Sequence, residues 1–203
     1  MTFVDPSAPV PGGLSTPWFV LRPIGADDAA ADHDAVMETR HQLRRWEQSS
    51  WPADDFTVEA NRADLVGLAE RHAAHRAFTF TVLDPAAPQC LGCVYLFPTD
   101  ATFLARSTVT PVADDRWSEV DVVAYFWVRL SRMADPSMQD PGLDERLLAA
   151  LRTWLTDEWQ FRCPVVVTNE QFAQQVELIG RTDLTLKFRL REPGKDGTYL
   201  VYG

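Results

Sequence analysis

The feature that most constrains this chain is a pair of apolar segments separated by an amphipathic one. Residues 120–128 are almost continuously apolar, which is typical of a strand covered by helices on both faces of a sheet. Residues 164–167 form a second, shorter apolar run. Strand, helix and strand in this order predict a parallel, right-handed crossover. The helix between them is predicted from large apolar side chains at three- and four-residue spacing, which are Leu143, Leu147, Leu148, Leu151, Trp154 and Leu155.

The rest of the chain is predicted to complete one domain around this unit. Residues 1–17 are rich in proline and glycine, so we expect an N-terminal arm that lies on the surface or is disordered. Residues 18–203 are expected to form a single α/β domain with a mixed, mostly antiparallel sheet and helices on both faces. Apolar spacing predicts further helices over residues 27–46, 58–75 and 169–179, and hairpins that pair 78–82 with 90–97 and 184–190 with 198–202.

Two details of this pattern carry local predictions. Gly92, inside a predicted strand, marks a bulge or a close backbone contact. Residues 98–119 are polar and irregular, and they are expected to form either a loop over a site or an insertion with no role.

The charge of the chain excludes some classes of partner. Twenty-nine acidic and nineteen basic side chains give a net charge of -10, which repels nucleic acid and anionic lipid. The same field favours a cationic small molecule or an amine, although it also serves solubility alone. The longest strongly apolar run, residues 122–128, is far shorter than the roughly 20 residues of a membrane-spanning helix.

The three cysteines, Cys90, Cys93 and Cys163, are an odd and sparse set. They favour a reduced, cytoplasmic setting over a disulfide framework. Cys90 and Cys93 lie in a predicted strand, where residues three apart face opposite sides, so we expect them to bind no zinc and the chain to hold no metal.

The turn that leads into the predicted 143–155 helix carries the functional hypothesis. The turn reads Gln139-Asp140-Pro141-Gly142-Leu143-Asp144. Together with the order of elements from Phe19 to Tyr202, it resembles the GNAT superfamily of N-acetyltransferases, in which Gln or Arg, two residues, Gly, one residue and Gly or Ala precede such a helix. Leu21-Arg22-Pro23, and Asn169 eleven residues before Gly180, resemble further family positions.

The resemblance implies a site for acetyl-coenzyme A as co-substrate. The free N–H groups at a helix start can hold a pyrophosphate, and glycine permits close approach. The thioester arm would run along the backbone of the central strand where two parallel strands splay apart. Asp144 and Pro141 depart from the family pattern; the extra carboxylates could point away, or Arg129 and Arg132 could compensate for their negative charge. The residues implied in binding are Phe126, Trp127, Val128, Arg129, Gln139, Gly142, Leu143, Asp144 and Asn169.

The resemblance also implies that an amine, on a small molecule or a protein, accepts the acyl group. Glu119 and Asp121 are the candidate carboxylates that remove its proton. The tyrosine that often serves as general acid in the family is replaced by Val176. That role is therefore vacant or has moved to Tyr125, Tyr199 or Tyr202. A homodimer is compatible with this fold.

A second interpretation stays open. Asp140 followed by Pro141 is a good N-cap and first-turn pair, so the turn could simply start a helix. A capped helix start and a phosphate cradle compete for the same N–H groups. In that case the chain would be a GNAT-like ligand-binding or protein-interaction module that has lost catalysis.

Overall fold

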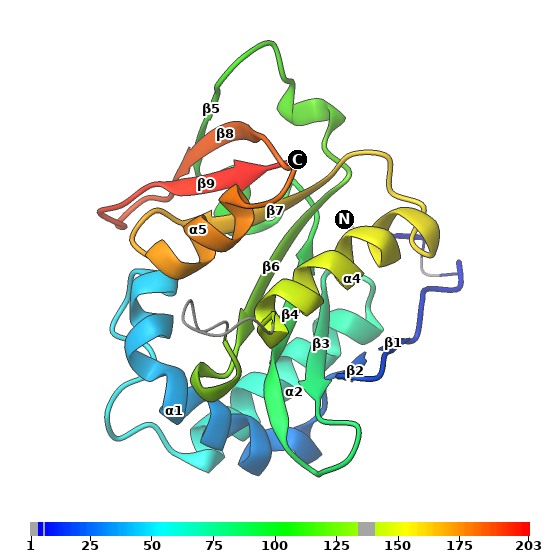
Figure 1. Cartoon of the computed structure of the whole chain (residues 1–203), viewed down its shortest axis with the longest axis vertical. Helices are drawn as coiled ribbons and strands as arrows, with labels where there is room; N and C mark the ends of the chain where they lie inside the picture. The colour runs from blue at the N-terminus through cyan, green and yellow to red at the C-terminus, as the bar shows by residue number, and fades with distance from the viewer. Residues whose placement is uncertain (1–3, 6, 134–140) are drawn as a thin grey trace.

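The computed structural model describes residues 4–5, 7–133 and 141–203 of the chain. Within them a single mixed sheet has the strand order β1-β2-β3-β4-β6-β7-β9-β8-β5 (Figure 1). Among the strand pairs of the described residues, β6 and β7 are the only parallel one. The strands are β1 (Leu14–Ser15), β2 (Val20–Pro23), β3 (Phe78–Leu83), β4 (Cys90–Phe97), β5 (Thr108–Pro111), β6 (Val122–Val128), β7 (Pro164–Asn169), β8 (Leu186–Arg191) and β9 (Tyr199–Tyr202).

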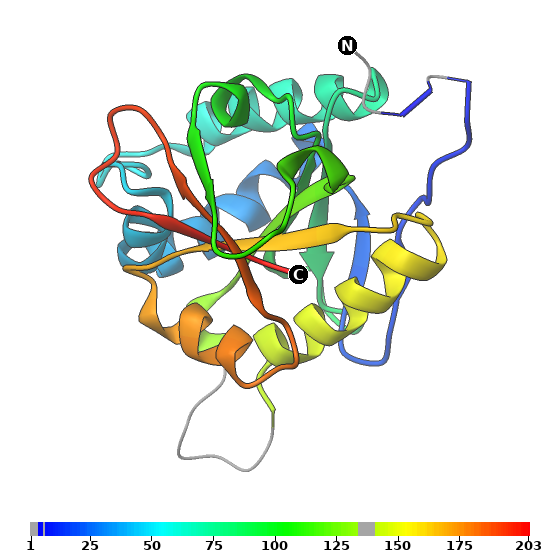
Figure 2. The ribbon, with the colours of Figure 1, turned by 90° about the horizontal axis from the view of Figure 1, so that it is seen from above.

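Helices cover both faces of the sheet, as the view from above shows (Figure 2). One face carries α1 and α2, and the opposite face carries α4 and α5. The predicted fold class is therefore confirmed. The α-helices are α1 (Ala29–Glu47), α2 (Val58–Ala73), α3 (Thr102–Ala105), α4 (Leu143–Asp157) and α5 (Ala173–Gly180), and the short 3-10 turns are Ala26–Asp28, Trp117–Glu119 and Leu130–Arg132.

The side chains of β6 divide between the two sides of the sheet, and all seven residues are buried. Ala124 and Phe126 belong to the core under α4, whereas Val123, Tyr125 and Trp127 belong to the core under α1. Alternation of this kind follows from the two-residue period of a strand. It explains why the sequence here is continuously apolar.

The two parallel strands separate after a short paired stretch. Val122–Ala124 of β6 pair with Pro164–Val166 of β7, and the pairing ends there. The rest of β6 stays bonded to β4, while the rest of β7 turns to β9. The second half of β6 therefore has no strand on its β7 side, and this is the splay that the GNAT resemblance implies.

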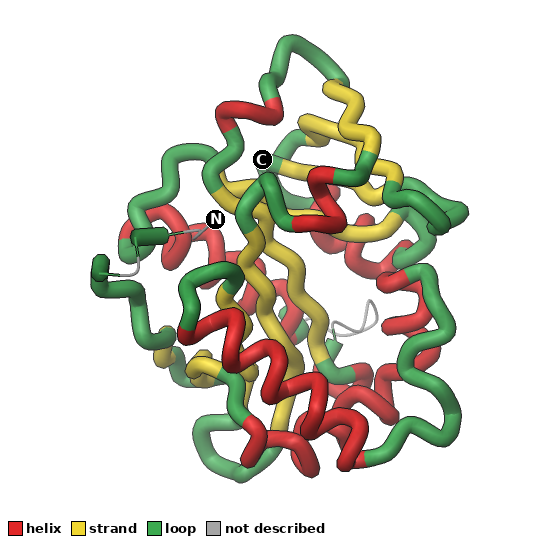
Figure 3. The backbone as a smooth tube through the Cα atoms, turned by 180° about the vertical axis from the view of Figure 1, so that it is seen from behind, coloured by secondary structure: helices red, strands yellow, loops and turns green. Residues whose placement is uncertain are grey.

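Several predicted elements differ in detail. The polar segment 98–119 was predicted as irregular, but it contains α3 and the edge strand β5, which pairs with β8. Thr108–Pro111 is too short for its alternation to stand out in the sequence. Phe103 of this segment borders the cavity described below. Helix α5 begins at Ala173, since Asn169 still pairs in β7. Figure 3 shows the strands, in yellow, running through the middle of the molecule with helices, in red, around them. Within the N-terminal arm, β1 pairs with β2; the division at residue 17 stays a prediction.

The expectation that Cys90 and Cys93 face opposite sides was also wrong. Their Sγ atoms lie 3.7 and 3.5 Å from the same oxygen, Oδ1 of buried Asp32. The β3–β4 register shifts between Val82 and Leu83, and such a bulge changes the side to which the following residues point. No helix in the described part of the chain has the length and apolarity that crossing a bilayer requires.

Candidate functional site

A cavity of about 560 Å³ opens on the α1–α2 side of the sheet. Its walls are largely aromatic, with Trp46 from α1, Tyr95 and Phe97 from β4, Phe103 from α3 and Tyr125 from β6. These rings contact one another: Trp46 meets Tyr125 edge-on at 6.1 Å between centroids, and Phe97 meets Phe103 edge-on at 5.0 Å. Mutual packing of this kind holds each ring in place.

Charged groups from the β8–β9 turn and α1 border the same cavity. Lys195 Nζ forms an ion pair with Glu47 Oε1 at 2.8 Å, and the Tyr199 hydroxyl donates to the Glu47 carbonyl at 2.9 Å. The carboxylate of Glu192 has no hydrogen-bond or ion-pair partner among the described residues. Burial raises the pKa of Glu192, and Lys195 partly offsets the effect.

Two residues of the cavity wall each carry a buried polar atom that lacks a partner among the described residues. These atoms are the Tyr125 hydroxyl and Trp46 Nε1, on side chains only 5% and 8% exposed. Burial raises the pKa of Tyr125, and the nearby Glu192 carboxylate raises it further. An unpaired buried polar group costs about 1–3 kcal/mol, a cost often accepted at binding sites.

On the α4 side of β6, the splay is narrow and is bordered by α5. Gln175 Nε2 donates a 3.0 Å hydrogen bond to the carbonyl of Phe126. The remaining space, between Val128, Asp144 and Phe172, is about 10 Å³. The backbone group expected to bind a thioester arm is thus bonded to a side-chain amide in this structure.

The start of α4 carries a carboxylate at the position where the sequence suggested an anion site. Gly142 is the N-cap, and Asp144 is 6% exposed. The Glu145 N–H donates to Asp144 Oδ1 at 3.1 Å, so this carboxylate occupies one of the free N–H groups of the helix start. Leu143 is buried in the core under α4. Gln139 and Asp140 lie outside the described residues.

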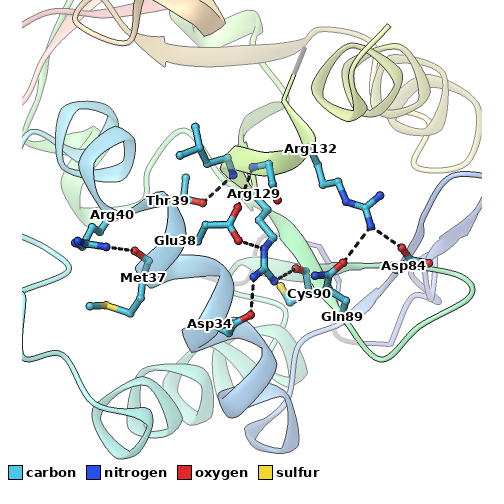
Figure 4. A network of polar contacts seen from close by, with 12 residues as sticks. Asp34, Met37, Glu38, Thr39, Arg40, Asp84, Gln89, Cys90, Arg129 and Arg132 are labelled. Atoms are coloured by element: carbon cyan, nitrogen blue, oxygen red, sulfur yellow. Dashed lines mark hydrogen bonds and ion pairs between the residues drawn. The ribbon is translucent and has the colours of Figure 1, made fainter. Parts of the chain in front are cut away.

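Arg129 joins the end of β6 to α1 (Figure 4). Its guanidinium is 8% exposed as a side chain and pairs with Asp34 at 2.6 Å and with Glu38. The Leu130 N–H donates to the Thr39 hydroxyl at 3.0 Å, which extends the same junction. Arg129 is therefore engaged by α1 carboxylates.

The remaining predicted site residues lie elsewhere. Glu119 and Asp121 precede β6, at the end opposite the splay: Asp121 Oδ2 accepts hydrogen bonds from the N–H groups of Arg162 and Cys163 at 2.6 and 2.9 Å. Glu119 pairs with Arg116 at 3.6 Å and borders a different cavity, of about 350 Å³. Asn169 is buried, and its Oδ1 accepts from the Gln171 N–H at 2.8 Å.

The structure thus places Tyr125 in the cavity wall, the Phe126 carbonyl and Val128 at the splay, and Trp127 in the core beneath the cavity. It separates Glu119 and Asp121 from them. Sequence reasoning missed the aromatic wall and Glu192. Tyr95, Phe97 and Tyr125 stand at alternate positions of neighbouring strands, which could have indicated a shared aromatic face. Nothing in the sequence indicated Glu192 or the Gln175 contact.

Comparisons with known proteins identify the fold. No protein-family model matches the chain, and no curated protein matches its sequence. The structure resembles ribosomal-protein-S5-alanine acetyltransferase from Vibrio fischeri, with a TM-score of 0.64 and 17% identity over 94% of each chain. RimJ of Mycobacterium smegmatis, in complex with CoA-disulfide, gives a TM-score of 0.66 at 16% identity over 94% of this chain and 84% of that one.

A third solved structure extends the likeness to a different acetyltransferase. The microcin C7 self-immunity acetyltransferase MccE, in complex with acetyl-CoA and AMP, gives a TM-score of 0.66 at 12% identity, over 95% of this chain and 96% of that one. The chain therefore has the GNAT acetyltransferase fold, as its sequence predicted.

Proposed function

We propose that this chain is an acyl-coenzyme A-dependent N-acyltransferase, most simply an N-acetyltransferase, that acts on an amine held in the aromatic cavity. One observation carries the proposal: β6 separates two neighbouring sites. Tyr125 faces the cavity, and the next residue, Phe126, presents its carbonyl in the splay between β6 and β7. Because the second half of β6 has no strand on its β7 side, an acyl group held in the splay would meet an amine from the cavity at that open edge, where direct transfer needs the reacting atoms within roughly 3–3.5 Å of each other. Holding both reactants in this way supplies most of what a direct transfer requires.

The residues of the splay fit a pantetheine arm once Gln175 moves. Its amide donates to the Phe126 carbonyl, which is the kind of bond a pantetheine amide would make. Gln175 is neutral, so its displacement exchanges one amide hydrogen bond for another. In the proposal the thioester supplies the acyl group, and the backbone of Phe126 to Val128 positions it.

The start of α4 does not fit a pyrophosphate equally well. Asp144 is buried there with its carboxylate on the Glu145 N–H. Two unit charges 4 Å apart repel by about 4 kcal/mol at an effective dielectric near 20. We therefore propose that acyl-coenzyme A binds weakly, chiefly through its arm.

The same two contacts favour a second candidate function. If Gln175 and Asp144 keep their places, the chain is a binding module on a GNAT fold, with a ligand in the aromatic cavity and no acyl transfer. This candidate predicts binding of a small molecule without turnover of any thioester.

Calorimetric titration with acetyl-coenzyme A distinguishes the two candidates. We expect weak binding to the wild type, about tenfold tighter binding to Asp144→Asn because the repulsion is removed, and tighter binding to Gln175→Ala because the Phe126 carbonyl is released. Glu177→Ala, on the exposed side of the same helix α5, is the matched control and should bind as the wild type does. An absence of heat at millimolar ligand in all four proteins would contradict the acyltransferase proposal.

Release of free coenzyme A thiol in the presence of an amine panel then tests catalysis. The roles of Glu119 and Asp121 stay proposals, and Glu119→Gln and Asp121→Asn test them in the same assay. From their distance from the splay in the fold, we expect both variants to keep most of the turnover. If either variant lost about a hundredfold or more of the turnover, the substituted carboxylate would take part in catalysis after all.

A further inference from the structure

We infer that the aromatic cavity selects an ammonium cation carried on a compact apolar body with a hydroxyl or carbonyl oxygen, with Glu192 as the counter-ion. The inference names the class of acceptor that the proposed acyltransferase would use. It rests on the proposed function only in calling this ligand an acyl acceptor. The binding it describes also holds if the domain does not catalyse transfer.

The dimensions and walls of the cavity fit a small molecule. Its volume of about 560 Å³ lies within the range of roughly 300–1,000 Å³ that is usual for small-molecule sites. Tyr95 and Phe97 are stacked with an angle of 3° between their planes, and Trp46 stands beside Tyr95 at 6.2 Å. Flat aromatic walls favour an apolar body, and their faces attract a cation.

The charges around the cavity determine whether it attracts a cationic or an anionic ligand. Glu47 is paired with Lys195, so these two charges offset each other. Glu192 has no hydrogen-bond or ion-pair partner among the described residues, and it adds a negative charge beside the rings that the nearby Lys195, already paired with Glu47, offsets only in part. On the α2 wall, Asp64 and the exposed Arg71 are of opposite sign. The balance is negative, as is the whole chain at -10, so a cation is attracted and an anion is repelled.

The unpartnered polar atoms specify the rest of the ligand. Trp46 Nε1 is buried without a hydrogen-bond acceptor in the described structure, and an indole N–H can only donate. The Tyr125 hydroxyl, equally buried and unpartnered, can donate or accept. Both atoms are closed off from the cavity in this structure. With a shift of the neighbouring side chains, a ligand oxygen would satisfy the indole, and the ammonium or the same oxygen would satisfy the phenol.

Calorimetric titration without acetyl-coenzyme A tests this inference separately from acyl transfer. The first probe is tyramine, which has an ammonium, an aromatic ring and a hydroxyl. The second is 3-(4-hydroxyphenyl)propionate, which keeps the ring and hydroxyl but carries a carboxylate. The third is 1,4-diaminobutane, which is an amine without the ring. We expect tyramine to bind and the other two to bind at least about tenfold more weakly, because each lacks a charge or an apolar body that the site requires.

Variants then assign the contacts. Glu192→Gln should weaken tyramine binding by about tenfold or more, because a charged hydrogen-bonding partner is lost, and Phe97→Leu should weaken it by removing one ring face. Glu59→Gln, at an exposed position of α2 outside the cavity, is the charge-matched control and should bind as the wild type does. If the wild type bound 3-(4-hydroxyphenyl)propionate as tightly as tyramine, the inference would be wrong, and this comparison needs no variant. Unchanged tyramine binding by a folded Glu192→Gln protein would also overturn it.

The outcome remains distinct from that of the acyltransferase proposal. Tyramine that binds but is never acylated would leave the inference standing and contradict the acyltransferase. Acyl transfer to amines without any preference for an aromatic cation would support the acyltransferase proposal and contradict the inference about the cavity.

Discussion

Gly92, in the middle of the sheet, is a position where a single methyl group should disturb the fold directly. Its φ is +151°, and a Cβ there would lie 2.1 Å from the Trp127 carbonyl oxygen on β6. We expect Gly92→Ala to lower the free energy of unfolding by about 3 kcal/mol or more, because backbone strain and overpacking each cost about 1–3 kcal/mol. Urea denaturation measures the change. Gly67→Ala is the control: its nearest neighbour would be 4.0 Å away, in helix α2, so it should raise stability by about 0.5–1 kcal/mol. A Gly92→Ala protein as stable as the wild type would contradict this account.

Single residues also show how far the sequence could predict the site. Glycine within a strand has few explanations, so the close approach at Gly92 was predictable and is confirmed. Tyr125 could be placed beside the site because it lies on the central strand. Gln175 could not, because its bond to Phe126 depends on how α5 sits against the splay. Glu192 has no partner among the described residues because of how the surrounding elements are placed, and this placement likewise could not be predicted.

At the scale of elements, the contact between α2 and β3 should make stability depend on pH. His72 lies edge-on against Phe78 and Phe80, with ring centroids 5.0 and 5.1 Å away, and burial lowers the pKa of its imidazole. The unfolded chain, with a histidine pKa of about 6.5, therefore binds the proton more readily than the folded chain. The contribution of His72 to stability is fully present above that pH, and it falls as the pH drops through about 6.5 toward the folded-state pKa.

Variants of two histidines test this dependence. Between about pH 7.5 and pH 5.5, we expect the loss of thermal stability to be smaller in His72→Gln than in the wild type, because the titrating group is gone. His41→Gln, at an exposed position of α1, should keep the wild-type dependence. Parallel pH profiles of the wild type and His72→Gln would show that another group is responsible.

The sequence predicted best those elements in which burial makes apolar residues recur at the spacing of a helix or a strand. Helix α4 buries Leu147, Leu151 and Trp154 on one face, and β6 is buried on both faces, so their patterns were unambiguous. Strand β5 lies at the sheet edge and is mostly exposed, so no apolar alternation marked it. The bulge that turns Cys90 and Cys93 toward Asp32 arises from the register with β3, which is a tertiary property that neither strand encodes alone.

The net charge of the whole molecule gives the last prediction. At -10, self-repulsion opposes the compact state, and salt screens it, with a Debye length near 10 Å at about 0.1 M. Exposed ion pairs contribute only about 0–1 kcal/mol each, and the pairs of the buried Arg129 side chain are screened less than fully exposed ones, so relief of repulsion should prevail. We expect the urea midpoint to rise as NaCl increases from about 20 to about 200 mM. In a double variant, Asp55→Asn with Asp196→Asn, both at exposed positions, the rise should be smaller, because the net negative charge is reduced by two. A midpoint that falls with salt would mean that the ion pairs outweigh the repulsion.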